Sequence, residues 1–326
     1  MPRGLLLPSL LVVTLGCVLV LAPSAWSQQP YPSRPIRLIV PFSPGGGGDV
    51  MARTVALKLT ERMGKSVVVE NRAGASGNIG AEIVVNSAPD GYTLLSTSST
   101  YGIQASLGKT PFDPLNDVTP IVALARAPAV FIVAPNSPFK TLRDLISAAK
   151  RYPGQVTFGT AGIGAIAHMN MEQFASLAGI QMSHVPYKGS SQALTDMLGG
   201  HIAVTTANPT VAAPMVKNVR IRALAVGGSH RLPSMPDVPT YPEAGLPGFD
   251  PYDWKAILGP KGISQEIVSR LNTEINTIVK DKDFAAVLEA DGSTALGGPP
   301  SQLAVLIKSD IERWRKLIRD RKIKVE

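Results

Sequence analysis

Apolar and polar residues follow two alternating patterns along the chain. Short runs rich in Val, Ile and Leu are typical of strands, and segments with apolar residues three or four positions apart are typical of helices. Strands are predicted at residues 37–40, 66–70, 93–96, 121–133, 157–159, 182–185, 202–206, 221–226 and 254–258. Helices are predicted from residue 50, at 79–87, 141–150, 165–178, 191–198, 211–216, 264–279 and 283–289, and from 300 onward. This order predicts an α/β fold with largely parallel strands.

The segment between the first strand and the first helix is the most informative. Pro41 and Pro44 end the strand, and four consecutive glycines, Gly45–Gly48, follow. Because these glycines have no side chains, their backbone N–H groups can point at a carboxylate or a phosphate. Asp49 is predicted as the N-cap of the helix, whose positive end faces the glycines. The segment indicates an anion site, and a tight turn without a ligand fits it equally well.

Two further loops follow predicted strands. Ser96–Tyr101 supplies five hydroxyls and a phenol, and Gly159–Gly164 is rich in glycine. Each alone fits a solvated turn. Ligands of open α/β sheets bind at the carboxyl ends of strands, so we expect these loops and the glycine turn to converge on a small anion.

The first residues have the pattern of a secretory signal peptide. Arg3 precedes an apolar run at residues 5–22, and Ala25 and Ser27 are small, so cleavage before Gln28 is predicted. The alternative is an uncleaved membrane anchor, because the apolar run is nearly long enough to span. The single cysteine, Cys17, lies in residues 1–27. The mature chain therefore has no disulfide and no thiolate site.

Length and charge limit the remaining classes. About 300 mature residues suit two lobes better than one core. The formal net charge of +8 helps to attract anionic solutes. The basic run at residues 313–324 is predicted as a solvated helix rather than a nucleic-acid surface. We expect a periplasmic monomer.

Signatures of cofactor chemistry and hydrolysis are absent from the sequence. Ser76 stands where a dinucleotide fingerprint needs its second glycine, and Gly48 is followed directly by Asp49 rather than by the Lys-Ser or Lys-Thr pair of a P-loop. No nucleophile elbow and no zinc-binding histidine spacing occurs. His168 and His184 are interpreted as structural, and a ligand contact by His168 stays open. We expect no cofactor, no metal and no catalysis.

Several motifs occur in a fixed order, and together they are specific. They are residues 31–37, 40–49, 69–74, 77–80, 89–92, 184–189, 198–200, 222–226 and 236–240. In these motifs the chain resembles the exported substrate-binding proteins of tripartite tricarboxylate transporters, the Bug or TctC-like receptors. The resemblance extends from Tyr31 nearly to the C-terminus.

The resemblance implies a type II periplasmic-binding-protein fold, with two α/β lobes joined by hinge strands and a ligand cleft between them. Residues 28–126 and 228–326 would form lobe 1, and residues 127–227 lobe 2. The crossings are expected near residues 121–133 and 221–226. The family typically holds a carboxylate through backbone N–H groups and bridging waters, without an arginine clamp.

The resemblance also implies the residues of the site. The first lobe would contribute Phe42, Ser43, Gly45, Gly46, Gly47, Gly48, Asp49, Thr97, Ser98 and Thr100. The second lobe would contribute Gly164, Ala165, His168, Tyr187 and Asn208. This chain has Ala165 and Ile166 where the family commonly has Thr and Ser, and Ala207 where it often has Asp.

These departures make the second wall less polar and remove a counter-charge for an ammonium group. We therefore expect a carboxylate with an apolar or aromatic body, such as a phthalate-like or medium-chain diacid, rather than aspartate or citrate. The expected partners are the membrane permease subunits of a tripartite tricarboxylate transporter. A ligand sensor for a two-component system and, from another class, a periplasmic hydrolase are the alternatives.

Overall fold

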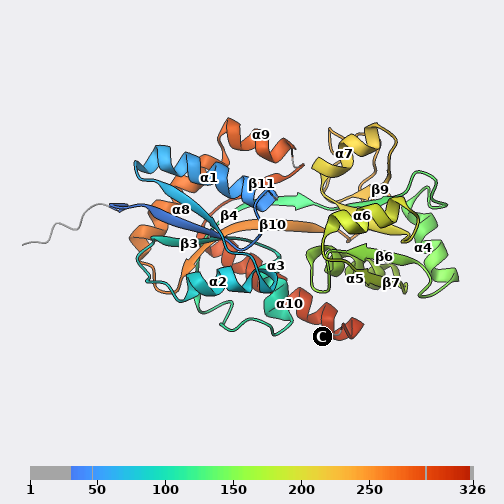
Figure 1. Ribbon diagram of the computed structural model, residues 1–326, viewed down its shortest axis with the longest axis horizontal. Coiled ribbons are helices and arrows are strands. Elements are labelled where there is room, and N and C mark those ends of the chain that lie inside the picture. Colours follow the sequence, from blue (N-terminus) through green and yellow to red (C-terminus); the bar gives the residue numbers. More distant parts are fainter. Residues whose placement is uncertain (1–30, 46, 291, 324–326) are drawn as a thin grey trace, which may run out of the picture. The chain divides into compact units, whose positions relative to one another are not determined.

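Two separate β-sheets organise the chain (Figure 1). The computed structural model describes residues 31–45, 47–290 and 292–323. Residues from Tyr31 onward form one compact unit. The predicted signal peptide at residues 1–27 and the predicted site residue Gly46 lie outside the described residues.

The first sheet has six strands in the order β11-β4-β10-β3-β1-β2. Their bounds are β1 Ile36–Val40, β2 Val67–Asn71, β3 Thr93–Ser98, β4 Val118–Pro128, β10 Tyr252–Pro260 and β11 Thr294–Gly297. Strand β1 pairs parallel with β2 and β3. Strand β10 pairs antiparallel with β3 and β4, and β11 pairs antiparallel with β4.

The second sheet has five strands in the order β7-β6-β8-β5-β9. Their bounds are β5 Val130–Val133, β6 Thr157–Thr160, β7 Ser183–Pro186, β8 Val204–Ala207 and β9 Arg222–Val226. Strand β6 pairs parallel with β7 and β8, whereas β5 pairs antiparallel with β8 and β9. Both sheets are mixed, so the prediction of largely parallel strands is wrong. Apolar runs locate strands but do not give their direction.

Helices cover both faces of each sheet. They are α1 Gly47–Met63, the 3-10 turn η1 Ala75–Gly77, α2 Asn78–Val85, α3 Thr100–Ser106, α4 Leu142–Arg151, α5 Ile166–Ala178, α6 Ser190–Leu198, α7 Pro209–Lys217, α8 Gln265–Val279, α9 Lys282–Ala290 and α10 Pro300–Arg321. The predicted helices are confirmed within a few residues. Helix α3 and strand β11 were not predicted.

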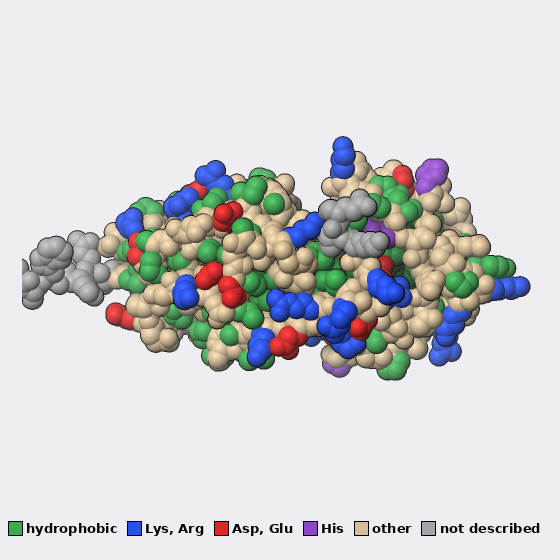
Figure 2. Space-filling view, turned by 90° about the horizontal axis from the view of Figure 1, so that it is seen from below, with side chains coloured by type: hydrophobic (Ala, Val, Ile, Leu, Met, Phe, Trp, Pro, Cys, Tyr) green, Lys and Arg blue, Asp and Glu red, His purple; other side chains and the backbone are tan. Residues whose placement is uncertain are grey.

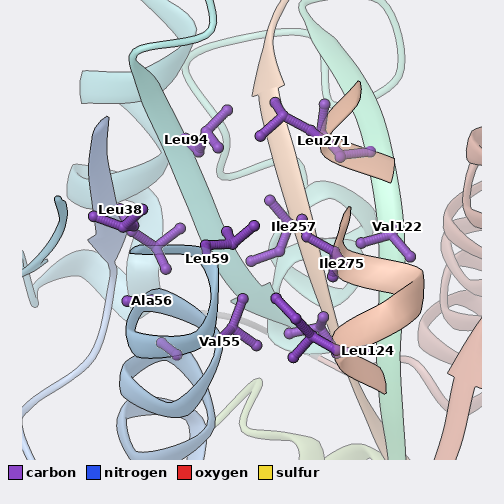
Figure 3. Close-up of a cluster of buried hydrophobic side chains, with 14 of the residues drawn as sticks. Leu38, Val55, Ala56, Leu59, Leu94, Val122, Leu124, Ile257, Leu271 and Ile275 are labelled. Carbon is purple, nitrogen blue, oxygen red and sulfur yellow. The ribbon is translucent and has the colours of Figure 1, made fainter. Parts of the chain in front are cut away.

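The core of the six-stranded sheet shows why the helix pattern is reliable. Val55, Ala56 and Leu59 of α1 meet Leu271 and Ile275 of α8 over one face of the sheet (Figure 3). On the opposite face, α10 packs three apolar residues, one helical turn apart, against the buried ring of Trp254. Burial of such apolar faces, each side chain contributing about 1.5–3 kcal/mol, drives this layered arrangement.

The segments that connect the two sheets meet at one residue. Strand β4 belongs to the first sheet and β5 to the second, with Ala129 between them. The N–H of Ala129 donates to the carbonyl of Pro251 at 3.0 Å, and Gly227 N–H donates to the carbonyl of Ala129 at 3.1 Å. The strand predicted at residues 121–133 is therefore two strands. The division into lobes at residues 127 and 227 stays a prediction.

Helix α10 also reaches both sheets. Its residues Trp314 and Leu317 share a buried cluster with Ile103 of α3 and Met169 of α5. Beyond them, Arg321 Nε donates to Glu172 Oε2 at 2.9 Å, and α5 carries this carboxylate. Helix α5 covers the five-stranded sheet, so the end of α10 holds α5, and with it this sheet, against α3.

The basic run on α10 is largely paired with acids. Asp320 accepts an ion pair from Lys316, and Arg319 lies 3.7 Å away from the same carboxylate. On the face shown in Figure 2, Lys and Arg side chains are interspersed with Asp and Glu. Within residues 31–323, as far as the structure describes them, no helix combines the length and apolar character needed to cross a bilayer.

Candidate ligand-binding site

A cavity of about 270 Å³ lies where three helices of the five-stranded sheet begin. Helices α5, α6 and α7 follow strands β6, β7 and β8 respectively, so the carboxyl ends of these strands point to it. The helices and the N-cap residue of α7 contribute Ile166, Ala167, Asn170, Ser190, Ser191, Leu194, Asn208 and Val211. Thr206, Ala207 and the connecting residues Ala127, Pro128, Ala129 and Asp253 complete the wall.

The amino termini of these three helices lack side-chain caps. Their N-cap residues Ala165, Gly189 and Asn208 make no capping hydrogen bond, whereas Thr141 and Ser264 cap α4 and α8. The first N–H groups of a helix have no partner within it and carry the positive end of the helix dipole. Three uncapped termini at one cavity therefore favour an anionic ligand.

A charged pair links this cavity to the glycine turn. Asp253 lines the cavity, accepts the N–H of Ser99 at 3.1 Å and pairs with Lys255 Nζ. Lys255 lies beside the turn, since its Cε is 4.0 Å from an ideal Cβ position on Gly48. Neither Asp253 nor Lys255 was predicted. The sequence feature that relates these two residues is their two-residue spacing on β10, which places both side chains on one face of the strand.

The glycine turn differs from its prediction in two respects. Asp49 lies inside the first turn of α1, which begins at Gly47, so its assignment as N-cap is wrong. Its carboxylate accepts the N–H of Gly45 at 2.9 Å and that of Arg53 Nε at 3.0 Å. The amide of Gly45 is therefore already bonded. Gly47 is exposed and Gly48 half-buried.

The buried carboxylate of Asp49 holds this turn in place. Burial alone would raise its pKa, but hydrogen bonds from Arg53, Gly45 and Asn71 outweigh it and lower the pKa to about 2. Because the pKa of Asp49 is lower in the folded than in the unfolded state, its ionised form stabilises the fold at pH values above the unfolded pKa. This stability is lost as the pH falls through the folded pKa.

We expect Asp49→Asn to lower the free energy of unfolding at pH 7 by about 2 kcal/mol. Urea unfolding followed by circular dichroism measures this loss. Asp237→Asn, at an exposed position, is the matched control and should change stability by less than about 0.5 kcal/mol. Equal stability of both variants would show that the turn does not depend on the Asp49 carboxylate.

The predicted hydroxyls of the first wall are mostly buried. Thr97 and Ser98 are buried on β3, and Thr100 begins α3. The neighbouring Ser99, which belongs to the predicted loop Ser96–Tyr101, accepts the N–H of Trp254 at 2.8 Å through its hydroxyl. The structure thus brings this loop beside β10, but these hydroxyls do not line the described cavity.

The predicted residues of the second wall have different surroundings. Asn208 lines the cavity, and Ala165 directly precedes its lining residue Ile166. Gly164 is buried, and its N–H donates to His168 Nδ1 at 3.2 Å. Half-buried Tyr187 donates its hydroxyl proton to Asp196 at 2.7 Å. Phe42 and Ser43 stay beside the glycine turn, away from the cavity wall.

Two histidines form a neutral stack behind the cavity. The rings of His168 and His184 lie 4.1 Å apart, and Phe158 stacks on His184 at 4.9 Å. Burial, with His184 nearby, lowers the pKa of His168 to about 3. Burial also lowers the pKa of His184 to about 4. Both rings are therefore neutral at pH 7, and neither lines the described cavity.

Asn170 lines the cavity and was missed by the sequence analysis. It lies on α5 one turn beyond Ile166, so the i, i+4 spacing of these residues was the available signal. Its side chain is 2% exposed, and its Oδ1 atom has no hydrogen-bond partner. Among the residues that the structure describes, no three His, Cys, Asp or Glu side chains form a metal-binding cluster.

A larger groove of about 1050 Å³ lies on the other face of the connecting strands. Arg126 and Tyr252 line it, whereas the alternate residues Ala127 and Asp253 line the smaller cavity. Arg126 stacks over the Tyr252 ring at 3.6 Å and pairs with Asp250. The carboxyl end of α9, which is the negative end of its dipole, borders this groove. Arg231 also lines this groove, and like Arg126 it pairs with a carboxylate, so we expect the smaller cavity to be the better anion site.

The two mixed sheets, their short connections and the cavity beside them define the fold of a periplasmic solute-binding receptor. The sequence model described as the tripartite tricarboxylate transporter family receptor matches residues 51–323, and the chain belongs to this family. The family is one of solute-binding receptors rather than enzymes.

Three similar proteins illustrate the relationship. Protein BugT of Bordetella pertussis is 38% identical over 297 residues, which are 90% of this chain and 91% of BugT. The structure of R. palustris Rpa4515 with adipate has a TM-score of 0.78 and 33% identity, covering 89% of this chain and 97% of that one. MatC from Rhodopseudomonas palustris with bound malate has a TM-score of 0.76 and 28% identity, covering 88% and 100%.

Proposed function

We propose that this protein is a periplasmic receptor that binds a small organic carboxylate and delivers it to the permease subunits of a tripartite tricarboxylate transporter. The observation that carries the proposal is the meeting of three uncapped helix amino termini at one cavity. The adipate and malate named for two similar structures are of the same chemical class.

The size of the cavity limits the ligand. At about 270 Å³ the cavity is smaller than typical pockets for drug-sized ligands, so it suits a diacid of four to six carbons or a small aromatic acid. Citrate, with three ionised groups, is less suited to a wall with this many apolar residues.

The lining favours an apolar or aromatic ligand body. Pro128, Ile166, Leu194 and Val211 contribute apolar surface. Among the described lining residues, Asp253 supplies the one carboxylate, and Lys255 already pairs with it. An ammonium group would therefore lack a free counter-charge, which disfavours amino acids.

Titration calorimetry of purified residues 28–326 with terephthalate, adipate, citrate and aspartate tests this proposal. We expect saturable binding of a diacid, recovered unchanged, and about 2.7 kcal/mol of added stability at a hundredfold excess over Kd. Tight binding of aspartate alone would contradict the proposed ligand class. Time-dependent product formation from esters or amides would instead favour a hydrolase.

A variant that fills the cavity provides the structural control. Val211 lines the cavity and is 43% exposed, so Val211→Trp should abolish binding without unfolding the protein. Val305→Trp is its match, because Val305 is also an exposed helical residue but lies on α10, outside the cavity. Unchanged binding by Val211→Trp would place the ligand elsewhere.

A further inference from the structure

Asn170 is a buried polar side chain for which the fold supplies no partner. It lies in the second turn of α5, is 2% exposed and lines the cavity together with Ile166 and Ala167. The Oδ1 atom has no hydrogen-bond partner. The Nδ2 atom of the same side chain makes no hydrogen bond to another described residue either. Buried polar groups are nearly always hydrogen-bonded, so a group of this kind needs an explanation.

Packing alone does not explain an amide at this position. Replacement of an unpartnered buried polar group by an apolar one of similar shape is nearly neutral or stabilising. The neighbouring Gln173 also has an unpartnered oxygen, but it does not line the cavity. Residues that break the rules of stability tend to lie at functional sites, and the cavity distinguishes Asn170 from Gln173.

The surroundings of Asn170 identify the chemistry of its partner. Three helix amino termini favour negative charge in this cavity. The cavity's described titratable side chain, Asp253, is paired with Lys255 on its own strand and bonded to Ser99 N–H. The Nδ2 atom of this carboxamide can donate its protons to an anionic oxygen, whereas Oδ1 is an acceptor that an ionised carboxylate leaves without a partner. The carboxamide carries no charge that would attract an ammonium group.

We propose that Asn170 is a specificity-determining residue that recognises the second carboxylate of a dicarboxylate ligand. This inference rests on the proposed function, because it assigns one end of the carboxylate ligand to the cavity. The first carboxylate is left to the remaining lining of the cavity, including the amino termini of α6 and α7. A monocarboxylate of the same length would leave the Nδ2 protons of Asn170 without an acceptor.

Matched acids and an isosteric pair of variants test the proposal. Succinate with butyrate, adipate with hexanoate and terephthalate with benzoate each differ in one carboxylate. We expect the wild type to bind the diacid of the best pair about thirtyfold more tightly than its monoacid. Asn170→Leu should weaken the diacid about thirtyfold and change the monoacid by less than about threefold.

The charged variant provides a gain-of-function arm. Asn170→Asp should weaken adipate by about a hundredfold or more, because two carboxylates would then face each other. It should bind 6-aminohexanoate more tightly than the wild type does. Gln173→Leu, one turn further along α5, is the matched control and should leave every affinity unchanged.

Stability separates a ligand role from a structural one. Asn170→Leu should melt no lower than the wild type, because it removes an unpartnered polar group. Equal weakening of diacid and monoacid in Asn170→Leu, or no change in either, would overturn the role of Asn170 and leave the receptor function standing. Failure of the wild type to bind any of these acids would overturn both proposals.

Discussion

Asp310→Ala is expected to lower the free energy of unfolding by about 4 kcal/mol. Asp310 is 2% exposed on α10, and its Oδ2 accepts the indole N–H of Trp254 at 3.0 Å and that of Trp314 at 3.1 Å. Its Oδ1 accepts from Arg313 Nη2 at 2.5 Å. Removal of the carboxylate leaves the two buried indole N–H donors without an acceptor, at a cost of about 1–3 kcal/mol each, and leaves Arg313 without this ion pair.

The matched variant Asp310→Asn separates hydrogen bonding from charge. Burial outweighs the Arg313 and indole contacts and raises the pKa of Asp310, so its ionised form is disfavoured by the fold. An amide oxygen still accepts the indole protons, so we expect Asp310→Asn to lower the free energy of unfolding by about half as much as Asp310→Ala does. Urea unfolding monitored by tryptophan fluorescence measures both. A loss below about 1 kcal/mol for Asp310→Ala would show that the indoles find other acceptors.

Acid is expected to destabilise the protein through the stacked histidines. The folded pKa values of His168 and His184, about 3 and about 4, lie below the unfolded value of 6.5. Between these values the unfolded chain binds more protons than the native state, so stability falls as pH is lowered from 6.5. At pH 5 each histidine should have cost roughly 2 kcal/mol relative to pH 7.5.

The groups around this stack act in opposite directions, since a nearby carboxylate favours a protonated ring and a hydrogen bond to a ring nitrogen opposes it. Thr160 Oγ1 lies 2.7 Å from His184 Nε2. The carboxylate of Glu172 is 4.0 Å from His168 Nε2 and is engaged by Arg321. His168 Nδ1 accepts the N–H of Gly164, so protonation there would break a hydrogen bond.

Urea unfolding at pH 7.5, 6.0 and 5.0 measures the effect. His184→Gln should reduce the change in unfolding free energy across this range by about half. His201→Gln and His230→Gln, at exposed positions, should leave the change as it is in the wild type. A flat profile for the wild type would mean that the buried rings accept protons without loss of the fold.

Local sequence patterns predicted most elements of this fold, because each pattern reflects a buried face. Val55, Ala56 and Leu59 recur at helical spacing, and the structure packs them on the sheet. Helix α3 was missed because its hydroxyl-rich beginning at Thr100 is also typical of a loop. The direction of β10 was missed because a strand's own residues do not encode which neighbours it pairs with.

The candidate site was predicted less completely than the fold. Asn208 stands at the cavity, and the family resemblance supplied it. The sequence placed Asp49 one position outside the helix, whereas its carboxylate folds back on Gly45. The spacing of Asn170 from Ile166 and of Lys255 from Asp253 shows which side chains share a face, but the place of that face depends on long-range packing of α5 and β10. The remaining predicted ligand contacts stay predictions.

The convergence of uncapped helix ends has a practical consequence for any laboratory that handles the protein. Chloride, phosphate, acetate or sulfate at buffer concentrations should compete for the same N–H groups, since such helix ends bind small anions generally. We expect apparent affinities measured in phosphate or acetate to be weaker than those measured in a bulky zwitterionic buffer. The choice of buffer salt therefore becomes a variable of the binding measurement.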